Sequence, residues 1–561
     1  MENEKVHQEA ENIFNAKVMY IFLSKDEKMR LVKADSMWMG DLGVAYHRFS
    51  YKEDSLAVIG REKEERKIIE FLNSKEKFKM TAITGRAGNG KSKLVYNTLF
   101  KSENIKKEWL VYGLNYEELE YFDYCKLCEL WNNEYIRKKV LFVIDYVTIN
   151  ASQIGKWIKN LYQNCRDDIR DVYIRIILVE RAQVIKNREP YWYVKVVKNN
   201  KLDICGAYND KECIQLNNLM DEQLQDIFIE YVENRHGRYK KLYNKEIDLE
   251  LCRKAARKII ENLENKCKTP LYIMYIADAW LENNGEIRNW NIEETLEYVA
   301  IKEDERISSF FDGDMEQENA LKKILIYTMA FNGLNLNKKS FLKNEFAVIQ
   351  NNFSTNNLGL RQLFGEVGEI EKNQEIILKS SLPEIVCEYY CMRYLHNKKN
   401  NDFDIEYIDE FINTAWKENP ISFSGFLCRV IEDFSEYDLV SFDNILKMPE
   451  ELSASSKLLY ADVLREYAFW KEDVENYYEN LCYAFEQILD LDEDISEDIV
   501  EIYVITLFNM AWWCEKNITK KKYIDSIYEQ LQRVRKSRND NICMACLAIE
   551  KIKDKKIIEQ V

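Results

Sequence analysis

The stretch ITGRAGNGKS, residues 83–92, matches the pattern G-x-x-x-x-G-K-[ST], whose fixed positions are Gly85, Gly90, Lys91 and Ser92. A short apolar run at 80–84 precedes it and predicts a strand, while residues 91–100 predict a helix. In such a context the glycines let the backbone amides face phosphate oxygens, and the helix N-terminus adds positive potential. The sequence therefore predicts a loop that binds a nucleoside triphosphate.

Two side chains of this loop have predicted roles toward phosphate and metal. Lys91 is expected to pair with the β- and γ-phosphate oxygens, and Ser92 to ligate Mg²⁺. A magnesium site also needs a carboxylate at the end of a neighbouring strand, and Asp145 follows five apolar residues in VLFVIDYV (140–147). We therefore predict ATP or ADP with Mg²⁺ as cofactors, Ser92 and Asp145 at the metal, and further nucleotide contacts from the loop residues Gly85, Arg86, Ala87, Gly88, Asn89, Gly90, Lys91 and Lys93.

Hydrolysis also requires a group that orients water. Many related ATPases have an acidic residue directly after the strand-end aspartate, where this chain has Tyr146. Glu180, in RIILVER (175–181), is the substitute that we propose, and Arg181 beside it could sense the γ-phosphate or form a surface ion pair. A slow Mg²⁺-dependent ATPase is the expected activity, with a predicted catalytic group of Lys91, Asp145, Glu180 and Arg181.

The pattern around the loop predicts an α/β domain within a mostly helical chain. Apolar runs at 108–114, 140–147, 172–180 and 213–217 alternate with helical patterns, which indicates a parallel sheet covered on both faces. From residue 221 the period is helical. A chain of 561 residues exceeds one core. The predicted domains are an N-terminal extension (1–56), a P-loop NTPase domain (57–217), a helical lid (218–310), a winged-helix-like domain (311–400) and a helical-repeat domain (401–561).

The last two domains follow from weaker patterns. A helix that ends at Asn332-Gly333, two strands around Lys372-Asn373 and a helix from Pro383 are typical of a winged-helix unit. Beyond residue 400, successive helical segments give a helix-pair repeat of roughly forty residues, in the range of TPR-like or HEAT-like repeats. These segments begin near Ser453, Lys471, Ser496, Thr519 and Asn539.

Composition limits the partners. The net charge of −16 argues against a broad nucleic-acid-binding face, because phosphate neutralisation needs clustered Lys and Arg. No apolar run approaches the roughly 18 residues that span a bilayer, and the first thirty residues lack the features of a targeting signal. We therefore expect a cytoplasmic protein that contacts neither membrane nor nucleic acid.

The ordered motifs resemble the STAND class of signal-transducing P-loop NTPases, particularly bacterial antiviral members. Besides the phosphate loop, the resemblance covers residues 58–396 and is carried by VIGREKE (58–64), LFVIDYV (141–147), RIILVER (175–181), TPLYI (269–273) and LPEIVCEYY (382–390). It implies that Gly60 and Arg61 lie near the base and ribose, and that Arg181 is the sensor arginine. Pro270 is similar to the proline of the family's G-x-P motif, which packs against the nucleotide, although Lys268 stands where that motif has glycine.

The resemblance also implies a function. Members of this class hold ADP in a closed monomer until the C-terminal repeats sense a trigger, after which ATP exchange permits self-association. For this chain it implies a phage or other protein trigger bound by the C-terminal helical domain. Because 56 residues are few for a fused enzyme, it further implies an effector that is absent, very small or a separate chain. Two alternatives stay open: a continuously cycling ATPase that remodels nucleic acid, and a STAND-type transcription regulator.

Overall fold

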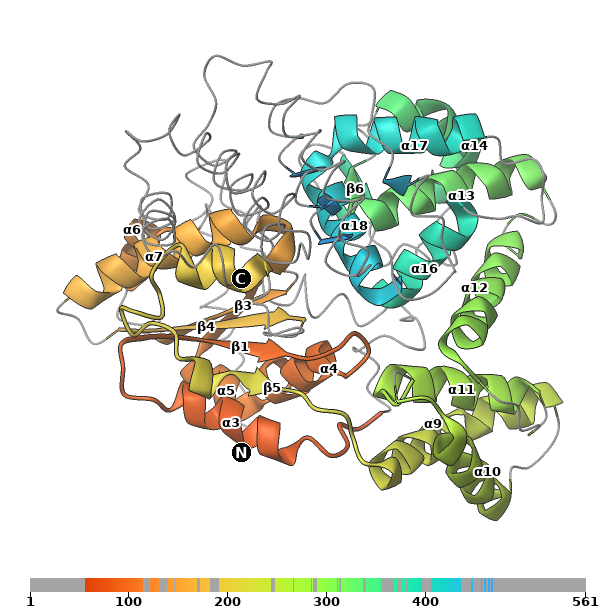
Figure 1. The fold of residues 1–561 in the computed structure, drawn as a ribbon, viewed down its shortest axis with the longest axis horizontal. Helices are drawn as coiled ribbons and strands as arrows, with labels where there is room; N and C mark the ends of the chain where they lie inside the picture. The colour runs from red at the N-terminus through yellow and green to blue at the C-terminus, as the bar shows by residue number, and fades with distance from the viewer. Residues whose placement is uncertain are drawn as a thin grey trace, which may run out of the picture. The chain divides into compact units, whose positions relative to one another are not determined.

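In the computed structural model of the chain, five parallel strands form one sheet in the order β2-β3-β4-β1-β5 (Figure 1). All five overlap the apolar runs that the sequence marks, with β1 and β3 starting one or two residues earlier, so the predicted parallel sheet is confirmed. The strands are short, and the central β3 and β4 are rich in Val, Ile and Leu, which suit a surface buried on both faces. The strands are β1 (Phe78–Thr84), β2 (Leu110–Leu114), β3 (Lys139–Asp145), β4 (Tyr173–Glu180) and β5 (Ile214–Gln215).

The structure describes residues 56–114, 119, 122–131, 139–145, 147–168, 172–181, 191–243, 248–265, 267–283, 285, 290–309, 311, 314–335, 340–354, 368–370, 375–378, 382–395 and 405–434, with a few short pieces between 445 and 467. The chain divides into two compact units. One comprises residues 1–328 with 333–387, and the other residues 329–332 with 388–561. The predicted N-terminal extension, apart from Leu56, and all five predicted helix starts of the repeat domain lie outside the described residues.

Helices cover both faces of the sheet (Figure 1). Alternation along β3 explains the two layers, because Phe142 and Ile144 pack toward one set of helices and Leu141 and Val143 toward the other. The first set comprises α6 (Tyr124–Trp131), α7 (Ala151–Asp167), α8 (Tyr191–Tyr193) and the π-helix Val194–Lys198. The second comprises α3 (Glu62–Leu72), α4 (Lys91–Val95), the π-helix Tyr96–Phe100 that continues α4, and α5 (Glu103–Glu108).

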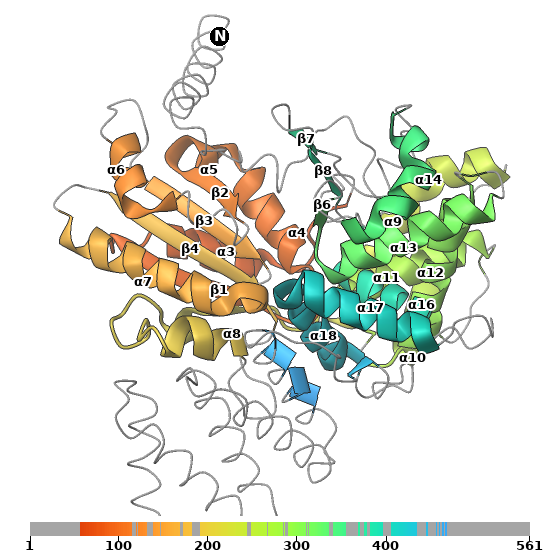
Figure 2. The same ribbon diagram turned by 90° about the horizontal axis from the view of Figure 1, so that it is seen from above.

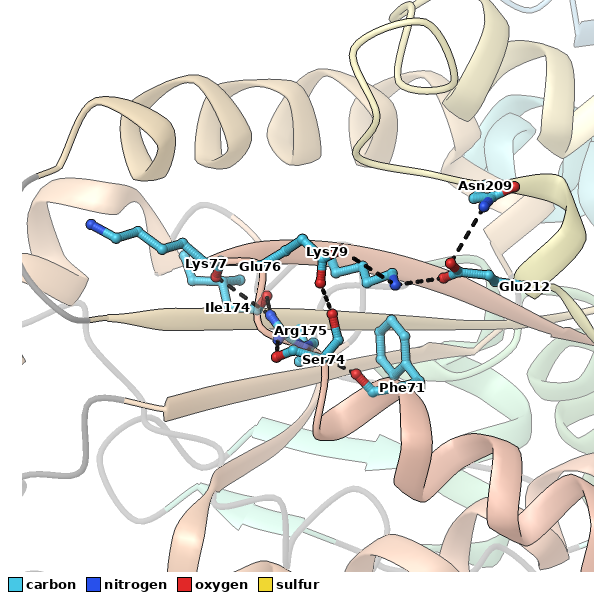
Figure 3. Close-up of polar contacts among 9 residues, drawn as sticks. All are labelled: Phe71, Ser74, Glu76, Lys77, Lys79, Ile174, Arg175, Asn209 and Glu212. Carbon is cyan, nitrogen blue, oxygen red and sulfur yellow. Dashed lines mark hydrogen bonds and ion pairs between the residues drawn. The ribbon is translucent and has the colours of Figure 1, made fainter.

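A buried arginine attaches α3 to the sheet (Figure 3). The Arg175 guanidinium, on β4, donates to the carbonyl oxygens of Phe71 (3.3 Å) and Ser74 (2.6 Å), which end α3 and begin the next turn. Burial lowers the pKa of Arg175 to about 10. Nearby, Lys79 of β1 pairs with Glu212 at 2.7 Å. Three rings lie within 6.0 Å of the guanidinium carbon, those of Phe71, Trp109 and Tyr173.

A group of helices follows β5, which agrees with the helical pattern of the sequence, while the domain bounds 218–310 stay a prediction. They are α9 (Asp221–Tyr243), α10 (Leu249–Asn262), α11 (Pro270–Glu282) and α12 (Ile292–Ser308). Asp248 caps α10, and Asn291 forms a capping box at α12. Tyr231 of α9 donates to the buried Asp278 of α11 at 2.7 Å, which fixes these two helices together. We call this helical group the lid.

The segment after the lid contains a small antiparallel sheet with strand order β6-β8-β7 (Figure 2). The two strands predicted around Lys372-Asn373 are therefore present, as β7 and β8. The winged-helix-like assignment of residues 311–400 stays a prediction. The elements here are α13 (Met315–Ala330), β6 (Leu334–Asn335), a 3₁₀ turn (Ser340–Leu342), α14 (Lys343–Ser354), β7 (Gly368–Ile370) and β8 (Glu375–Leu378).

The described part of the second unit is a helical cluster. It contains α17 (Ile405–Glu418), α18 (Pro420–Phe434) and the residues of α16 (Glu384–Leu395) from Glu388 onward. Arg429 donates to Glu388 at 2.8 Å, and both side chains are buried. The rings of Trp416 and Phe423 meet edge to face at 5.5 Å. Among the described residues of the chain, we find no helix whose length and apolar character would let it cross a membrane.

Candidate functional site

The phosphate loop joins the end of β1 to the start of α4. Its backbone depends on glycine, because Gly88 and Gly90 have φ angles of 76° and 84°, in the left-handed region that other residues rarely adopt. Gly90 is also the N-cap of α4, so the loop leads directly into the N-terminus of this helix. The strand, the loop and the helix thus have the arrangement of an α/β P-loop NTPase domain.

Lys91 lies across the loop that precedes it. Its ammonium group donates to the carbonyl oxygens of Gly85 (2.8 Å) and Arg86 (3.0 Å). Burial lowers the pKa of Lys91, and the charge of Arg181 lowers it further. The opposite effect on this pKa comes from three carboxylates, those of Asp145, Glu180 and Glu384. The charges of the predicted strand-end acids and of the predicted arginine therefore both act on the loop lysine.

The predicted metal pair is also brought together. Ser92 Oγ donates to Asp145 Oδ2 at 3.2 Å. Asp145 ends β3, which is separated from β1 by β4, and it pairs in register with Val179 of that strand. A hydroxyl and a carboxylate are the hard oxygen ligands that Mg²⁺ takes beside nucleotide phosphates. The donor set therefore fits a magnesium nucleotide.

The Glu180 carboxylate accepts hydrogen bonds from neighbouring backbone and side-chain groups. One of its carboxylate oxygens accepts from Thr148 N (2.7 Å) and Thr148 Oγ1 (2.9 Å), and the other accepts from Arg181 N (2.8 Å). It thereby holds the turn that follows β3. Arg181 is only 7% exposed, so its guanidinium is not a solvated surface group. The catalytic role of Glu180 and the sensor role of Arg181 stay predictions, and Tyr146 lies outside the described residues.

Arg61 holds the loop from the side of β5. Its guanidinium, 5% exposed, donates to Asn217 O at 2.8 Å and to Asn89 O at 3.2 Å. Burial lowers the pKa of Arg61, and Glu64, 3.9 Å away, acts in the opposite direction. The Asn89 side chain adds a second link, because Nδ2 donates to Leu216 O at 3.2 Å. The predicted contacts of Gly60 and Arg61 with base and ribose stay predictions.

The lid reaches the loop at the start of α11. Leu271 N donates to Gly88 O at 3.2 Å, and a Cβ placed on Gly90 would lie 4.0 Å from Pro270 Cγ. Pro270 is therefore beside the loop, and its predicted contact with the nucleotide stays a prediction. Lys268 points to the first residue of α9, because its ammonium group donates to both carboxylate oxygens of Asp221 at 2.9 and 3.0 Å.

The sequence does not predict some of the residues that form this site. Thr148, Leu216 and Asn217 contribute through contacts that join distant segments, and no local pattern marks them. Thr269 and Leu271 lie in the TPLYI stretch (269–273), in which the resemblance implies a role for Pro270 alone. Thr before Pro at a helix start is an N-cap pattern and could have drawn attention to Thr269.

No protein-family model and no curated protein matches the sequence. Among solved structures, the Walker-type ATPase paby2304 of Pyrococcus abyssi is similar at 12% identity, covering 61% of this chain and 99% of its own, with a TM-score of 0.29. The structure of the Aeropyrum pernix ORC1 protein in complex with DNA is similar at 12% identity. The match covers 62% of this chain and 96% of the ORC1 chain, with a TM-score of 0.30. Domain III of the Thermotoga maritima replication initiation protein DnaA is similar at 14% identity. The match covers 45% of this chain and 96% of the DnaA domain, with a TM-score of 0.24. Likenesses this weak assign no function, which must be argued from the site.

Proposed function

We propose that the chain binds ATP and ADP with Mg²⁺ and uses them as a conformational switch. The observation that carries the proposal is the contact between Ser92 and Asp145, beside a phosphate loop crossed by Lys91. In this proposal Lys91 and the loop amides hold the β- and γ-phosphates, and Ser92 and Asp145 hold the metal. Bound Mg²⁺ supplies neutralisation of phosphate charge.

A switch is favoured over continuous turnover by two features. The lid bonds directly to the loop through Leu271 and Gly88, so occupancy of the loop and the position of the lid are coupled. Glu180 accepts three hydrogen bonds from Thr148 and Arg181, so the proposed water-orienting carboxylate is less available to accept a hydrogen bond from water. Slow hydrolysis is the expected consequence.

The finer assignment is a STAND-type sensor, supported by the ordered motifs and by the lid contact. In it, a protein trigger such as a phage component binds the C-terminal helical domain, ADP is exchanged for ATP, and the chain self-associates and engages a separate effector. A role in bacterial antiviral defence rests on the resemblance alone.

The test starts from full-length protein purified gently. The bound nucleotide is extracted and identified, and the molar mass is then followed by light scattering after addition of ATP and Mg²⁺, with and without phage lysate. Bound ADP and assembly only with lysate support the switch. Lys91→Ala is the control that should neither retain nucleotide nor assemble. Fast turnover by a monomer, stimulated by nucleic acid and indifferent to lysate, would instead establish the cycling ATPase.

A further inference from the structure

Thr269 occupies the N-cap of α11 without capping it. Its backbone has the extended geometry of an N-cap, with φ −127° and ψ 152°, and Pro270 follows at the first helical position. A capping threonine normally accepts a hydrogen bond from the amide two or three residues on. Here the Thr269 side chain forms no capping bond, and Oγ1 is buried without a hydrogen-bond partner among the described residues. The residue is 1% exposed.

The backbone amide that would donate to the Thr269 side chain donates to the phosphate loop instead. Leu271 N, two residues after the cap, donates to Gly88 O in the phosphate loop at 3.2 Å. The two segments are closely packed, because a Cβ placed on Gly88 would lie 2.9 Å from Thr269 Oγ1 and 3.2 Å from Leu271 Cβ. The lid therefore contacts the loop through the Leu271 amide, which would otherwise be available for the N-cap bond of α11.

We propose that the Leu271 amide exchanges between two acceptors. It bonds to Gly88 O when the lid is docked, and to Thr269 Oγ1 when the lid leaves the loop. The buried hydroxyl of the docked form gains a partner in the undocked form, so Thr269 favours undocking. This inference rests on the proposed nucleotide function, in which undocking of α11 from the loop accompanies ADP release.

The size of the effect follows from the capping bond. Loss of an N-cap side chain changes a helix equilibrium by about 2- to 30-fold. Thr269→Val keeps the branched shape but removes the acceptor, so the undocked form loses its compensating bond while the docked form loses only an unpaired hydroxyl. Thr269→Ser keeps the acceptor and is the matched control.

Two measurements on the full-length chain test the exchange. The first is hydrogen exchange of the loop peptide 83–92 in nucleotide-free protein. The second is the release rate of a fluorescent ADP analogue after dilution into excess ADP. For Thr269→Val we expect both rates to fall by about 2- to 30-fold, and for Thr269→Ser we expect values within about twofold of the wild type.

Opposite outcomes overturn the inference. Unchanged or faster rates in Thr269→Val would show that the hydroxyl does not favour undocking. Faster exchange in both the loop and α9 would show that the side chain only stabilises the lid. If the wild type binds no ADP analogue, the proposed function fails, but the hydrogen-exchange comparison still decides whether Thr269 controls docking.

Discussion

Replacing Arg61 by methionine should weaken binding of every ligand that carries a polyphosphate, whatever its base. Methionine keeps the aliphatic stem but removes the guanidinium, which donates to Asn89 O at 3.2 Å and Asn217 O at 2.8 Å. Only the first bond holds the phosphate loop itself. The loss leaves its carbonyl group without this donor in a buried setting.

The size of the effect follows from that single bond. A hydrogen bond from a charged donor contributes about 1.5–3 kcal/mol, which corresponds to about a 10- to 150-fold change in the dissociation constant. The remaining link from Asn89 Nδ2 to Leu216 O keeps part of the loop in place, so the lower end of this range is expected. Arg61→Lys retains the charge but lacks the planar fork of donors, and should fall between the wild type and Arg61→Met.

The assay is a titration of wild type and both variants with ATP, GTP and inorganic tripolyphosphate in the presence of Mg²⁺. If Arg61 positions the loop, Arg61→Met weakens all three ligands by a similar factor. If the guanidinium instead contacts the base, ATP binding falls while tripolyphosphate binding stays unchanged. That second result would refute the reasoning, as would undiminished affinity for all three.

Three further predictions concern the metal pair, the buried arginine and a buried thiol. Ser92→Ala should weaken ATP binding about tenfold in Mg²⁺ and hardly at all in EDTA, with Ser92→Thr as the control; equal loss in both buffers would contradict a metal role. Arg175→Met should destabilise the attachment of α3 by about 2–4 kcal/mol, seen as faster hydrogen exchange of peptide 62–72 with only partial rescue by Arg175→Lys; unchanged exchange would count against it. Burial raises the pKa of the Cys165 thiol from 9.0 to about 11, so the unfolded chain ionises first and the contribution of this thiol to the free energy of unfolding is lost between pH 9 and 11. Denaturant titrations of the wild type and Cys165→Ala should therefore differ less at pH 11 than at pH 8, and a constant difference would disprove that linkage.

The sheet and the core of the site were predictable because their signals are local. Five apolar runs determine the strands, and the spacing from Gly85 to Ser92 determines the loop. Asp145 was found because a parallel sheet brings the carboxyl ends of its strands to one edge, where the loop also lies. The structure places Asp145 within hydrogen-bonding distance of Ser92, while its role at a metal stays a prediction.

The interactions that hold the loop were not predictable. Arg61 donates to Asn217, which lies 156 positions away in the sequence, and Leu271 donates to Gly88, which is also distant in the sequence. Both use backbone carbonyl groups, which carry no residue-specific signal. Glu180 was singled out correctly as a strand-end carboxylate, but its bonds to Thr148 depend on how the turn after β3 folds.

The most direct test of the central claim is a titration of the full-length chain with ATP in Mg²⁺, wild type against Lys91→Ala. The Lys91 ammonium group donates to the loop carbonyl oxygens of Gly85 and Arg86. We predict that the wild type binds ATP and that Lys91→Ala binds it about 10- to 150-fold more weakly. Equal affinity in the two proteins, or no binding by the wild type, would contradict a phosphate-binding role for this loop.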